Sequence, residues 1–446
     1  MKFAIPAGAR HILQTLQTAG REAYLVGGCV RDLLRGVPPH DWDICTSALP
    51  AETRACFAQN KVIDTGLRHG TVTILAPGGP FEVTTYRADG PYSDGRRPDR
   101  VRFVSTLRED LSRRDFTINA IALSLDGTLQ DPFGGAADIR AGRIRCVGEP
   151  ARRFQEDGLR VMRALRFSAV LGYGIEPETA NALHQCRAML DRVAGERIRV
   201  ELCKLLTGPC AGDVLRQYPD VLCQFWPELG PLVELEQHNP WHCWGGWEHT
   251  LRALEAAPPG EVLRLAVLLH DVGKPACKST DEAGIDHFYG HPAVSARLAG
   301  DMLRRLRYDN ATRRRVITLV ERHDMPLALS DQAIRRWLNR LGPEAFLQLL
   351  EVKRADGMGQ AYEKGKDRLR LLEEIRARTE EIIAQGQCFS LKDLAIDGRD
   401  VIAAGVTPGP AVGRVLKEVL DQVLSGQLPN ERDALLALAE QAARSI

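Results

Sequence analysis

The stretch LVGGCVRDLLRGVPPHDWDI, from Leu25 to Ile44, constrains the fold of this chain more than any other. Its first part is an apolar run that ends at Val26 and breaks at the pair Gly27-Gly28, after which Arg31 lies on the first turn of a short amphipathic helix. Glycine lets the backbone approach a ligand closely, and a helix start offers free N–H groups and a partial positive charge to phosphate. The sequence therefore predicts a strand, a phosphate cradle and a helix in succession.

The second part of the stretch is a predicted strand that carries Asp41 and Asp43 after a Pro-Pro turn. Side chains two apart on a strand share one face, so these carboxylates converge and need a cation between them. Hard oxygen ligands of this kind suit Mg²⁺. A glycine pair alone is usually a turn, and D-x-D alone is common on solvated strand edges. The ordered combination is far more specific, and it indicates nucleotidyl transfer.

The order GG-x-V-R-D, then D-x-D, resembles the signature of the DNA polymerase β-like nucleotidyltransferases. Within them it resembles the class II tRNA nucleotidyltransferases, the CCA-adding enzymes, together with the bacterial poly(A) polymerases. The resemblance implies that Asp41 and Asp43 are catalytic and bind two Mg²⁺ ions. It also implies a set of nucleotide-binding residues, namely Gly27, Gly28, Arg31, Arg114, Asp157, Arg160, Arg163 and Arg166.

Composition limits where such a protein works. The 446 residues include 59 basic and 58 acidic side chains, so RNA affinity must come from local patches, and we expect no DNA partner. Eleven cysteines without a C-x-x-C pattern indicate a reducing, cytoplasmic location. No stretch approaches 18 consecutive apolar residues, so we expect no membrane span.

Two segments after the D-x-D extend the resemblance. The polar, Arg-rich segment from Arg87 to Asp110 is predicted to be a loop, and the resemblance suggests the flexible loop that enzymes adding the terminal A use. The motif RRDF follows, and its Arg114 matches the nucleotide-contacting arginine of the family. Glu82, on a predicted strand, is a candidate third carboxylate, although an ordinary sheet glutamate is the simpler interpretation.

The segment RRFQEDGLRVMRALRF matches the family's E-D-x-x-R motif at Asp157 and Arg160. Cytosine and adenine both present an amine donor beside a ring-nitrogen acceptor, whereas uracil and guanine present the opposite order. An Asp and an Arg one helical turn apart would therefore accept C and A and refuse U and G. Arg163 and Arg166 continue the same helical stripe. Gly158 stands where relatives usually have Ala, which is expected to weaken that turn by up to about 1 kcal/mol.

A second constellation lies further along the chain. His249 precedes the dipeptide His270-Asp271, which ends an apolar helix, and Asp356 follows much later. Adjacent His and Asp side chains at a helix end can share one transition metal with a distant His and Asp. The pattern resembles the HD phosphohydrolases, and in some relatives the positions of His291 and His323 hold a second metal. A core role for these histidines is the alternative.

We expect a mainly α protein of four parts. They are a polymerase β-like α/β nucleotidyltransferase head (1–150), a helical, nucleotide-selecting neck (151–225), an HD-type helical domain (226–385) and a helical, tRNA-binding C-terminal body and tail (386–446). The neck helix contributes a buried stripe of Ile198, Leu202, Leu205 and Leu206.

The activity implied by the resemblance is template-independent addition of C, C and A to the 3′ end of tRNA, with CTP and ATP as substrates. An enzyme that adds only the terminal A, and a poly(A) polymerase, are the nearest alternatives. The turn from Gly66 to Thr71 is less basic than is typical of the poly(A) members. An HD phosphohydrolase with a tRNA-binding head is the alternative from another class, and the intact Asp41, Asp43 and Arg114 disfavour it.

Overall fold

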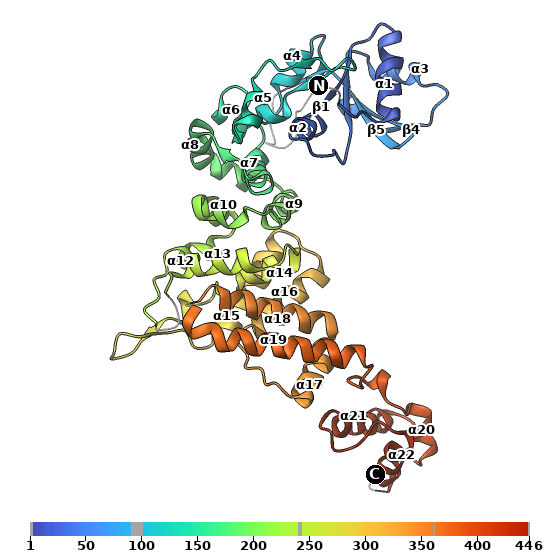
Figure 1. Cartoon of the computed structure of the whole chain (residues 1–446), viewed down its shortest axis with the longest axis vertical. Helices are drawn as coiled ribbons and strands as arrows, with labels where there is room; N and C mark the ends of the chain where they lie inside the picture. The colour runs from blue at the N-terminus through green and yellow to red at the C-terminus, as the bar shows by residue number, and fades with distance from the viewer. Residues whose placement is uncertain (1–2, 91–100, 240–242, 361, 445–446) are drawn as a thin grey trace. The chain divides into compact units, whose positions relative to one another are not determined.

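The computed structural model describes residues 3–90, 101–239, 243–360 and 362–444 (Figure 1). The chain divides into two compact units, Met1–Pro227 and Glu228–Ile446. The predicted division into four parts is finer than this and stays a prediction. The first unit contains a mixed sheet and a set of helices, and the second unit is almost entirely helical.

The sheet of the first unit has seven strands. They are β1 (Ala23–Val26), β2 (Asp43–Thr46), β3 (Val62–Gly66), β4 (Thr71–Ala76), β5 (Gly79–Thr85), β8 (Ala122–Leu123) and β9 (Leu129–Gln130). Their order is β3-β4-β5-β2-β1-β8-β9. Pairing is antiparallel except between β2 and β5, where Asp43 lies opposite Glu82. The D-x-D segment therefore leads into the central strand of the sheet.

Short helices accompany the sheet. They are α1 (Ala7–Thr18), α2 (Gly28–Leu34), α3 (Pro50–Cys56), α4 (Leu107–Ser112) and α5 (Gly135–Arg140), with 3-10 turns η1 (Leu67–His69) and η2 (Thr117–Asn119). In α1 the apolar residues Ile12, Leu13 and Leu16 recur at helical spacing, and all three are fully buried.

The prediction of a continuous loop from Arg87 to Asp110 is wrong at both ends. The segment begins with β6 (Arg87–Asp89), which pairs with β7 (Val101–Phe103), and it ends within α4. Thr106 caps α4 because its side chain accepts a hydrogen bond from the backbone of Glu109. The tip of the predicted loop, residues 91–100, lies outside the described residues.

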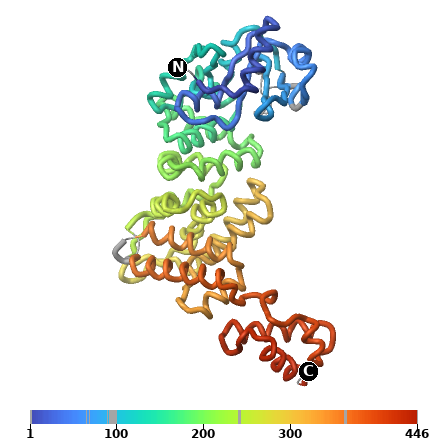
Figure 2. The backbone as a smooth tube through the Cα atoms, turned by 45° about the vertical axis from the view of Figure 1, so that its right-hand side comes forward, coloured from blue at the N-terminus to red at the C-terminus, as the bar shows by residue number. Residues whose placement is uncertain are grey.

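Helices follow the sheet in the first unit, drawn in green in Figure 2. They are α6 (Pro150–Glu156), α7 (Leu159–Leu171), α8 (Pro177–Cys186), η3 (Arg187–Arg192), α9 (Gly195–Leu206), α10 (Ala211–Gln217) and α11 (Pro219–Phe225). A small parallel pair, β10 (Arg143–Ile144) and β11 (Gly174–Ile175), joins them to the sheet region. The predicted stripe on α9 is confirmed, since Ile198, Leu202, Leu205 and Leu206 are all buried.

The second unit is built from helices and one small hairpin. The helices are η4 (Pro227–Leu229), α12 (Gly230–Val233), α13 (Gly246–Ala256), α14 (Glu261–Leu269), η5 (Pro275–Cys277), α15 (His291–Arg305), α16 (Asn310–Arg322), α17 (Asp331–Leu341), α18 (Pro343–Met358), α19 (Tyr362–Ala384), η6 (Leu391–Asp393), α20 (Gly398–Ala403), α21 (Pro410–Leu424) and α22 (Arg432–Ala443). The hairpin pairs β12 (Ser279–Thr280) with β13 (Asp286–His287).

The helices of the second unit pack in two groups. Helices α13, α14, α16 and α19 all contact α18, and α18 and α19 run side by side in both views (Figures 1 and 2). Helices α20, α21 and α22 share a separate apolar cluster that includes Val401, Val419 and Leu435. None of the helices in the described part of the chain is long and apolar enough to cross a membrane.

Candidate functional site

Three carboxylates meet at the start of the central strand. Asp43 is the first residue of β2, and Asp41 lies two residues earlier, just outside the strand that was predicted to carry both. Glu82 lies opposite Asp43 in parallel register, so these two side chains share a face of the sheet. Burial raises the pKa of Asp43, Arg114 opposes the rise, and the charges of Glu82 and Asp41 add to it. A divalent cation would relieve this repulsion, so the donor set fits Mg²⁺.

The glycine pair forms the floor of a cavity beside these carboxylates. Gly27 has a φ of 78°, a conformation that favours glycine. A Cβ atom there would lie 3.2 Å from Nη1 of Arg114 and 3.8 Å from Oδ2 of Asp43, so any side chain would fill the cradle. The cavity measures about 560 Å³, a size typical of small-molecule sites. Its polar lining comes from Gly27, Gly28, Arg31, Asp43, Arg114, Asp115, Asn119, Arg163, Arg166, Lys204 and Thr207.

The two arginines beside the cradle are oriented by partners from other elements. Arg31 on α2 donates from Nη1 to Oδ1 of Asn119 at 2.9 Å, and from Nε to its neighbour Asp32 at 3.0 Å. Arg114 pairs with Oδ2 of the buried Asp110 at 3.3 Å. The Nε atom of Arg114 is buried and has no hydrogen-bond partner among the described residues. A buried donor left unpaired is costly, which favours an anionic ligand in this cavity.

Helix α7 adds two further arginines, which the acid Glu201 of α9 holds in position. Arg166 lies 3.0 Å from Glu201, while Arg163 lies 2.6 Å from Asp115 and 3.7 Å from Glu201. Both guanidinium groups also lie over the ring of Phe167, at 4.0 Å for Arg166 and 5.3 Å for Arg163. Burial alone would raise the pKa of Asp115, but Arg163 and a hydrogen bond from Asn119 hold it well below its ordinary value.

The predicted base-reading residues are separated by a break in the helix. Asp157 has an extended conformation after α6, and α7 begins only at Leu159. Asp157 therefore precedes α7, but it lies one turn from Arg160 as expected, because the backbone N–H of Arg160 donates to the carbonyl of Asp157 at 3.0 Å. Asp157 pairs with Arg197 of α9 at 3.0 Å, and Arg160 pairs with Glu156 at 2.8 Å.

Gly158 is required by close packing. A Cβ atom at this position would lie 2.5 Å from the backbone oxygen of Met189. The expected loosening of a helical turn at Gly158 is therefore wrong, because Gly158 lies between two helices and its missing side chain lets η3 approach. The polypeptide at Met189 thereby supports the turn that carries Asp157.

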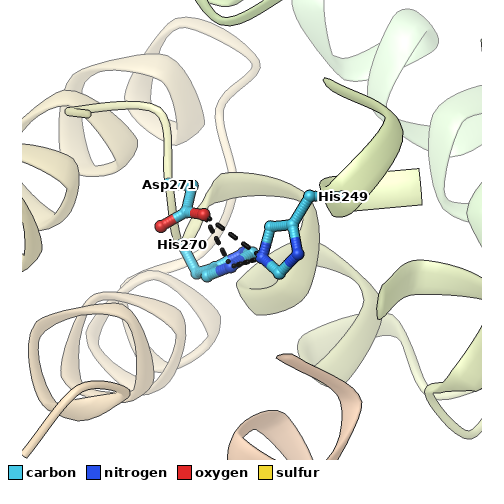
Figure 3. A group of neighbouring side chains, drawn as sticks. All are labelled: His249, His270 and Asp271. Carbon is cyan, nitrogen blue, oxygen red and sulfur yellow. Dashed lines mark hydrogen bonds and ion pairs between the residues drawn. The ribbon is translucent and has the colours of Figure 1, made fainter. Parts of the chain in front are cut away.

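A second cluster of polar side chains is buried within the second unit. His249 of α13, His270 and Asp271 at the end of α14, and Asp356 of α18 come together as predicted. Figure 3 shows His249, His270 and Asp271 pointing toward one another. The two Nε2 atoms are 3.3 Å apart, and Oδ2 of Asp271 lies 3.4 Å from His249 and 3.1 Å from His270. Oδ1 of Asp356 lies 3.2 Å from Nε2 of His249.

The hydrogen bonds of the Nδ1 atoms show which ring nitrogen of His249 and His270 carries a proton. Nδ1 of His249 faces the carbonyl of Gly359 at 3.0 Å, and Nδ1 of His270 faces the carbonyl of Val267 at 2.6 Å. A carbonyl only accepts, so each Nδ1 carries a proton, and each Nε2 is directed at the carboxylates of Asp271 and Asp356. With a cation bound, the Nε2 atoms and the carboxylate oxygens would be its ligands, a donor set that fits a transition metal.

His291 and His323 form a second group around the same aspartate. Their Nε2 atoms are 3.2 Å apart and lie 3.3 Å and 3.8 Å from Oδ1 of Asp271. Each Nδ1 again faces a backbone carbonyl, at 2.8 Å for His291 and 2.7 Å for His323. Asp271 therefore belongs to two groups of potential metal ligands, one with each pair of histidines. We call these residues, together with Asp356, the His-Asp centre.

Sequence reasoning missed several residues that hold both sites together. Glu201 could have been found, because it interrupts the apolar stripe of α9 and an acid in a buried stripe signals a buried ion pair. Lys274, 2.7 Å from Asp271, was visible only as part of the HD-x-G-K pattern. Asn119 and Arg197 carried no local signal, because their partners lie far away in the sequence.

A phosphate cradle and a carboxylate-bearing strand on a mixed sheet, followed by a helical body, define the polymerase β-like nucleotidyltransferases. Three family models match the chain. The poly(A) polymerase head domain matches residues 23–145, the "Probable RNA and SrmB- binding site of polymerase A" matches residues 172–218, and the tRNA nucleotidyltransferase domain 2 matches residues 292–439.

Whole-chain relatives identify the family. The CCA-adding enzyme of Levilactobacillus brevis is 37% identical over 439 residues, which cover 96% of each chain. That of Limosilactobacillus fermentum is 36% identical over 445 residues, covering 97% of this chain and 96% of the relative. The crystal structure of the Bacillus stearothermophilus CCA-adding enzyme in complex with CTP has a TM-score of 0.75 and 32% identity, covering 98% of this chain and 97% of that one. The chain belongs to the CCA-adding enzymes, which are tRNA nucleotidyltransferases.

Proposed function

We propose that Asp41 and Asp43 bind Mg²⁺ and that Glu82 is the third carboxylate of the same site. The observation that carries this proposal is that Asp43 and the unpartnered Nε of Arg114 line the cavity of the glycine cradle, while Asp41 and Glu82 line a second cavity that shares Asp43. Bound Mg²⁺ would supply Lewis-acid chemistry, lowering the pKa of the 3′-hydroxyl of tRNA and neutralising charge on the leaving pyrophosphate.

The side chains around the cradle are proposed to hold the triphosphate of CTP or ATP. The backbone at Gly27 and Gly28 can approach phosphate oxygens because no Cβ intervenes. Arg31 and Arg114 are each held by a partner from another element, so little side-chain freedom is lost when they bind phosphate. Arg163 and Arg166 extend the positive lining of the cavity toward α9, where they can attract the anionic nucleotide.

Base selection is proposed for Asp157 and Arg160. Arg160 is almost fully buried, and it donates to Glu156 and to the backbone carbonyls of Arg153 and Arg113, so its guanidinium plane is fixed before a base arrives. Asp157 keeps lone pairs beyond those that Arg197 uses, and a carboxylate can accept from an amine at the same time. This supports reading of C and A by an acceptor and a donor.

The product is proposed to be a complete CCA end made with CTP and ATP, and the relatives reported above disfavour poly(A) synthesis. The test is incubation with tRNA that lacks CCA, with CTP and ATP supplied singly and together, and products resolved to single nucleotides. Three added nucleotides, and no more, are expected with both substrates. Addition of the A alone to a tRNA ending in CC, or a long A tail, would overturn the proposal.

The His-Asp centre favours a second function. We infer that it binds a transition metal and hydrolyses phosphoesters such as 2′,3′-cyclic phosphates, because imidazole nitrogens and carboxylate oxygens converge in it. A structural metal site is the alternative. Metal analysis combined with a phosphodiesterase assay tests both, since metal without hydrolysis would leave only the structural role.

The remaining expectations are proposals of the same kind. Residues 386–446 are proposed to bind the tRNA, and α20 to α22 give this segment an apolar cluster of its own to support such a surface. The boundaries at residues 150, 225 and 385 and a cytoplasmic location are proposed on the sequence arguments above. All of the described cysteines are free, which accords with a reducing compartment.

A further inference from the structure

A cavity of about 520 Å³ lies in the second unit, away from the His-Asp centre. Its lining comes from α17, the segment after α19, and α21 with the loop that follows it. Its polar lining consists of Arg335, Gln387, Cys388 and Asn430, and its apolar lining includes Val423 and Leu428. The volume is sufficient for a ligand the size of a nucleotide.

Two polar atoms in this lining are buried without a partner. Neither Nε of Arg335 nor Oε1 of Gln387 has a hydrogen-bond partner among the described residues. The other amide of the lining is already occupied, because Asn430 donates to the carbonyl of Asp393 and accepts from the backbone of Ala395. A buried donor and a buried acceptor in one cavity are a reason to expect a ligand that satisfies both.

The acids nearest to Arg335 are held by other groups. Asp331, one turn earlier on α17, accepts from Nε and Nη2 of Arg378 at 2.7 Å and 2.6 Å. Asp393 accepts from the backbone and the hydroxyl of Ser390. Burial raises the pKa of the Cys388 thiol to about 11, so no thiolate neutralises the guanidinium at neutral pH. Asp331 interacts electrostatically with Arg335, but its ion pair is with Arg378, so Arg335 has no ion-pair partner among the described residues.

We propose that this cavity is a ribose-phosphate site. Arg335 donates to a phosphate oxygen, Gln387 accepts from a ribose hydroxyl, and Val423 and Leu428 cover the carbons of the sugar. The same chemistry is offered by a free sugar phosphate and by a nucleotide within an RNA strand. The site lies outside the nucleotide cavity of the head. For an RNA ligand it rests on the proposed tRNA-binding function of residues 386–446 and names the pocket and the chemistry that would recognise the strand.

The test compares four forms of the full-length protein with two probes. The forms are the unchanged protein, Arg335→Gln, Gln387→Glu and the control Arg336→Gln, which alters the next arginine of α17, an exposed residue outside the cavity lining. The probes are ribose 5-phosphate, measured by calorimetry, and tRNA lacking its CCA end, measured by filter binding. Gln387→Glu adds a carboxylate to the same cavity lining and repels phosphate, and it changes the size of the side chain very little.

At least about a tenfold loss of affinity for one probe is expected in both Arg335→Gln and Gln387→Glu, and none in Arg336→Gln, since hydrogen bonds to charged groups contribute on this scale. Loss confined to ribose 5-phosphate would identify a free sugar phosphate as the ligand, and loss confined to tRNA would identify a nucleotide of the RNA. If neither probe loses more affinity with these variants than with Arg336→Gln, the proposal is overturned.

Discussion

The carboxylates of the head and those of the His-Asp centre differ in how much water they meet. Asp41 and Asp43 are partly open to solvent, although the surroundings of Asp43 are enclosed enough to raise its pKa, whereas His249, His270 and Asp271 are at most 1% exposed. An exposed set of acids can exchange its cation with each substrate that arrives. A buried set of ligands would release its cation less readily, because a charge left without a partner is costly away from water.

The head cavity and the His-Asp centre also differ in the charged side chains around them. The head cavity combines a few acids with a ring of arginines, as expected for a site whose ligand carries several negative charges. The His-Asp centre has Lys274 and Arg368 as its nearby cations, and each of them is paired with an aspartate of the centre. The head is thus suited to an anionic substrate and the His-Asp centre to a resident cation, and the predictions below test this contrast.

The largest expected effect is on the head. Asp43→Ala should lower the rate of CTP and ATP addition by about a thousandfold or more, because it removes a ligand of the proposed Mg²⁺, which would stabilise the developing negative charge. Single-turnover assays measure the rate, and filter binding should show tRNA affinity unchanged. Asp64→Ala, which removes an exposed acid of β3 paired with Arg54, is the matched control and should leave the rate unaltered. A loss of less than tenfold in Asp43→Ala would contradict the catalytic assignment.

The second largest effect is expected in the metal content of the His-Asp centre. Asp271→Asn should remove most of the bound transition metal, because Asp271 contacts both pairs of histidines. Nucleotide addition should continue at the normal rate, since the change lies in the other unit. Metal content by mass spectrometry and addition rate are measured on the same preparation. Asp281→Asn, an exposed acid paired with His287, is the control. Equal metal in both variants would show that the centre is not a metal site.

The third prediction concerns base selection in the head. Arg160→Lys keeps the charge and loses the planar fork, so discrimination against UTP and GTP should relax by about tenfold or more. Asp157→Asn gains a donor that can meet O4 of uracil or O6 of guanine, so misincorporation should rise while Mg²⁺ dependence stays the same. Measuring kcat/KM for the four nucleotides distinguishes base reading from simple attraction of triphosphates. Simple attraction predicts that kcat/KM falls by the same factor for all four.

The smallest effect is on stability in acid. Because the folded-state pKa of Asp115 lies below its ordinary value of 3.8, its ion pair with Arg163 contributes stability that is fully present above pH 3.8. That contribution is lost as the pH falls through the folded-state pKa. Asp115→Asn should therefore lower the unfolding free energy at neutral pH by about 2 kcal/mol, as is typical for a charge-assisted hydrogen bond. Urea melts across this pH range should show that the difference in unfolding free energy between the unchanged protein and Asp115→Asn becomes smaller in acid. A difference that does not depend on pH would refute the ion pair.

Much of this organisation could be predicted from the sequence because it is encoded locally. The Gly27-Gly28 turn, the stripe of α9 and the sequence His270-Asp271 each place their chemistry within a few residues. The CCA-adding family and the polymerase β-like head followed from the order of such motifs, and the comparisons confirm both.

What could not be predicted depends on distances between remote segments. The break before α7 lies where the backbone of Met189 packs closely against Gly158, and nothing in E-D-x-x-R reveals that approach. The side chain of Asp157 pairs with Arg197, forty positions later, and that of Arg160 pairs with Glu156. Sequence spacing indicated which side chains could meet, but the packing of η3 and α9 decided which of them do.

The order of the strands also bears on how the protein is synthesised. The central strand β2 needs β5, whose pairing residue Glu82 is made well after Asp43, and β1 completes its pairing only with Leu123 of β8. Such non-local pairing is slow to form, and it cannot begin before the later strand has left the ribosome. A nascent chain that stalls before β8 would expose one edge of β1 beside the glycine cradle. We therefore expect the head to acquire affinity for nucleotides abruptly, and only once β8 has been translated and released from the exit tunnel.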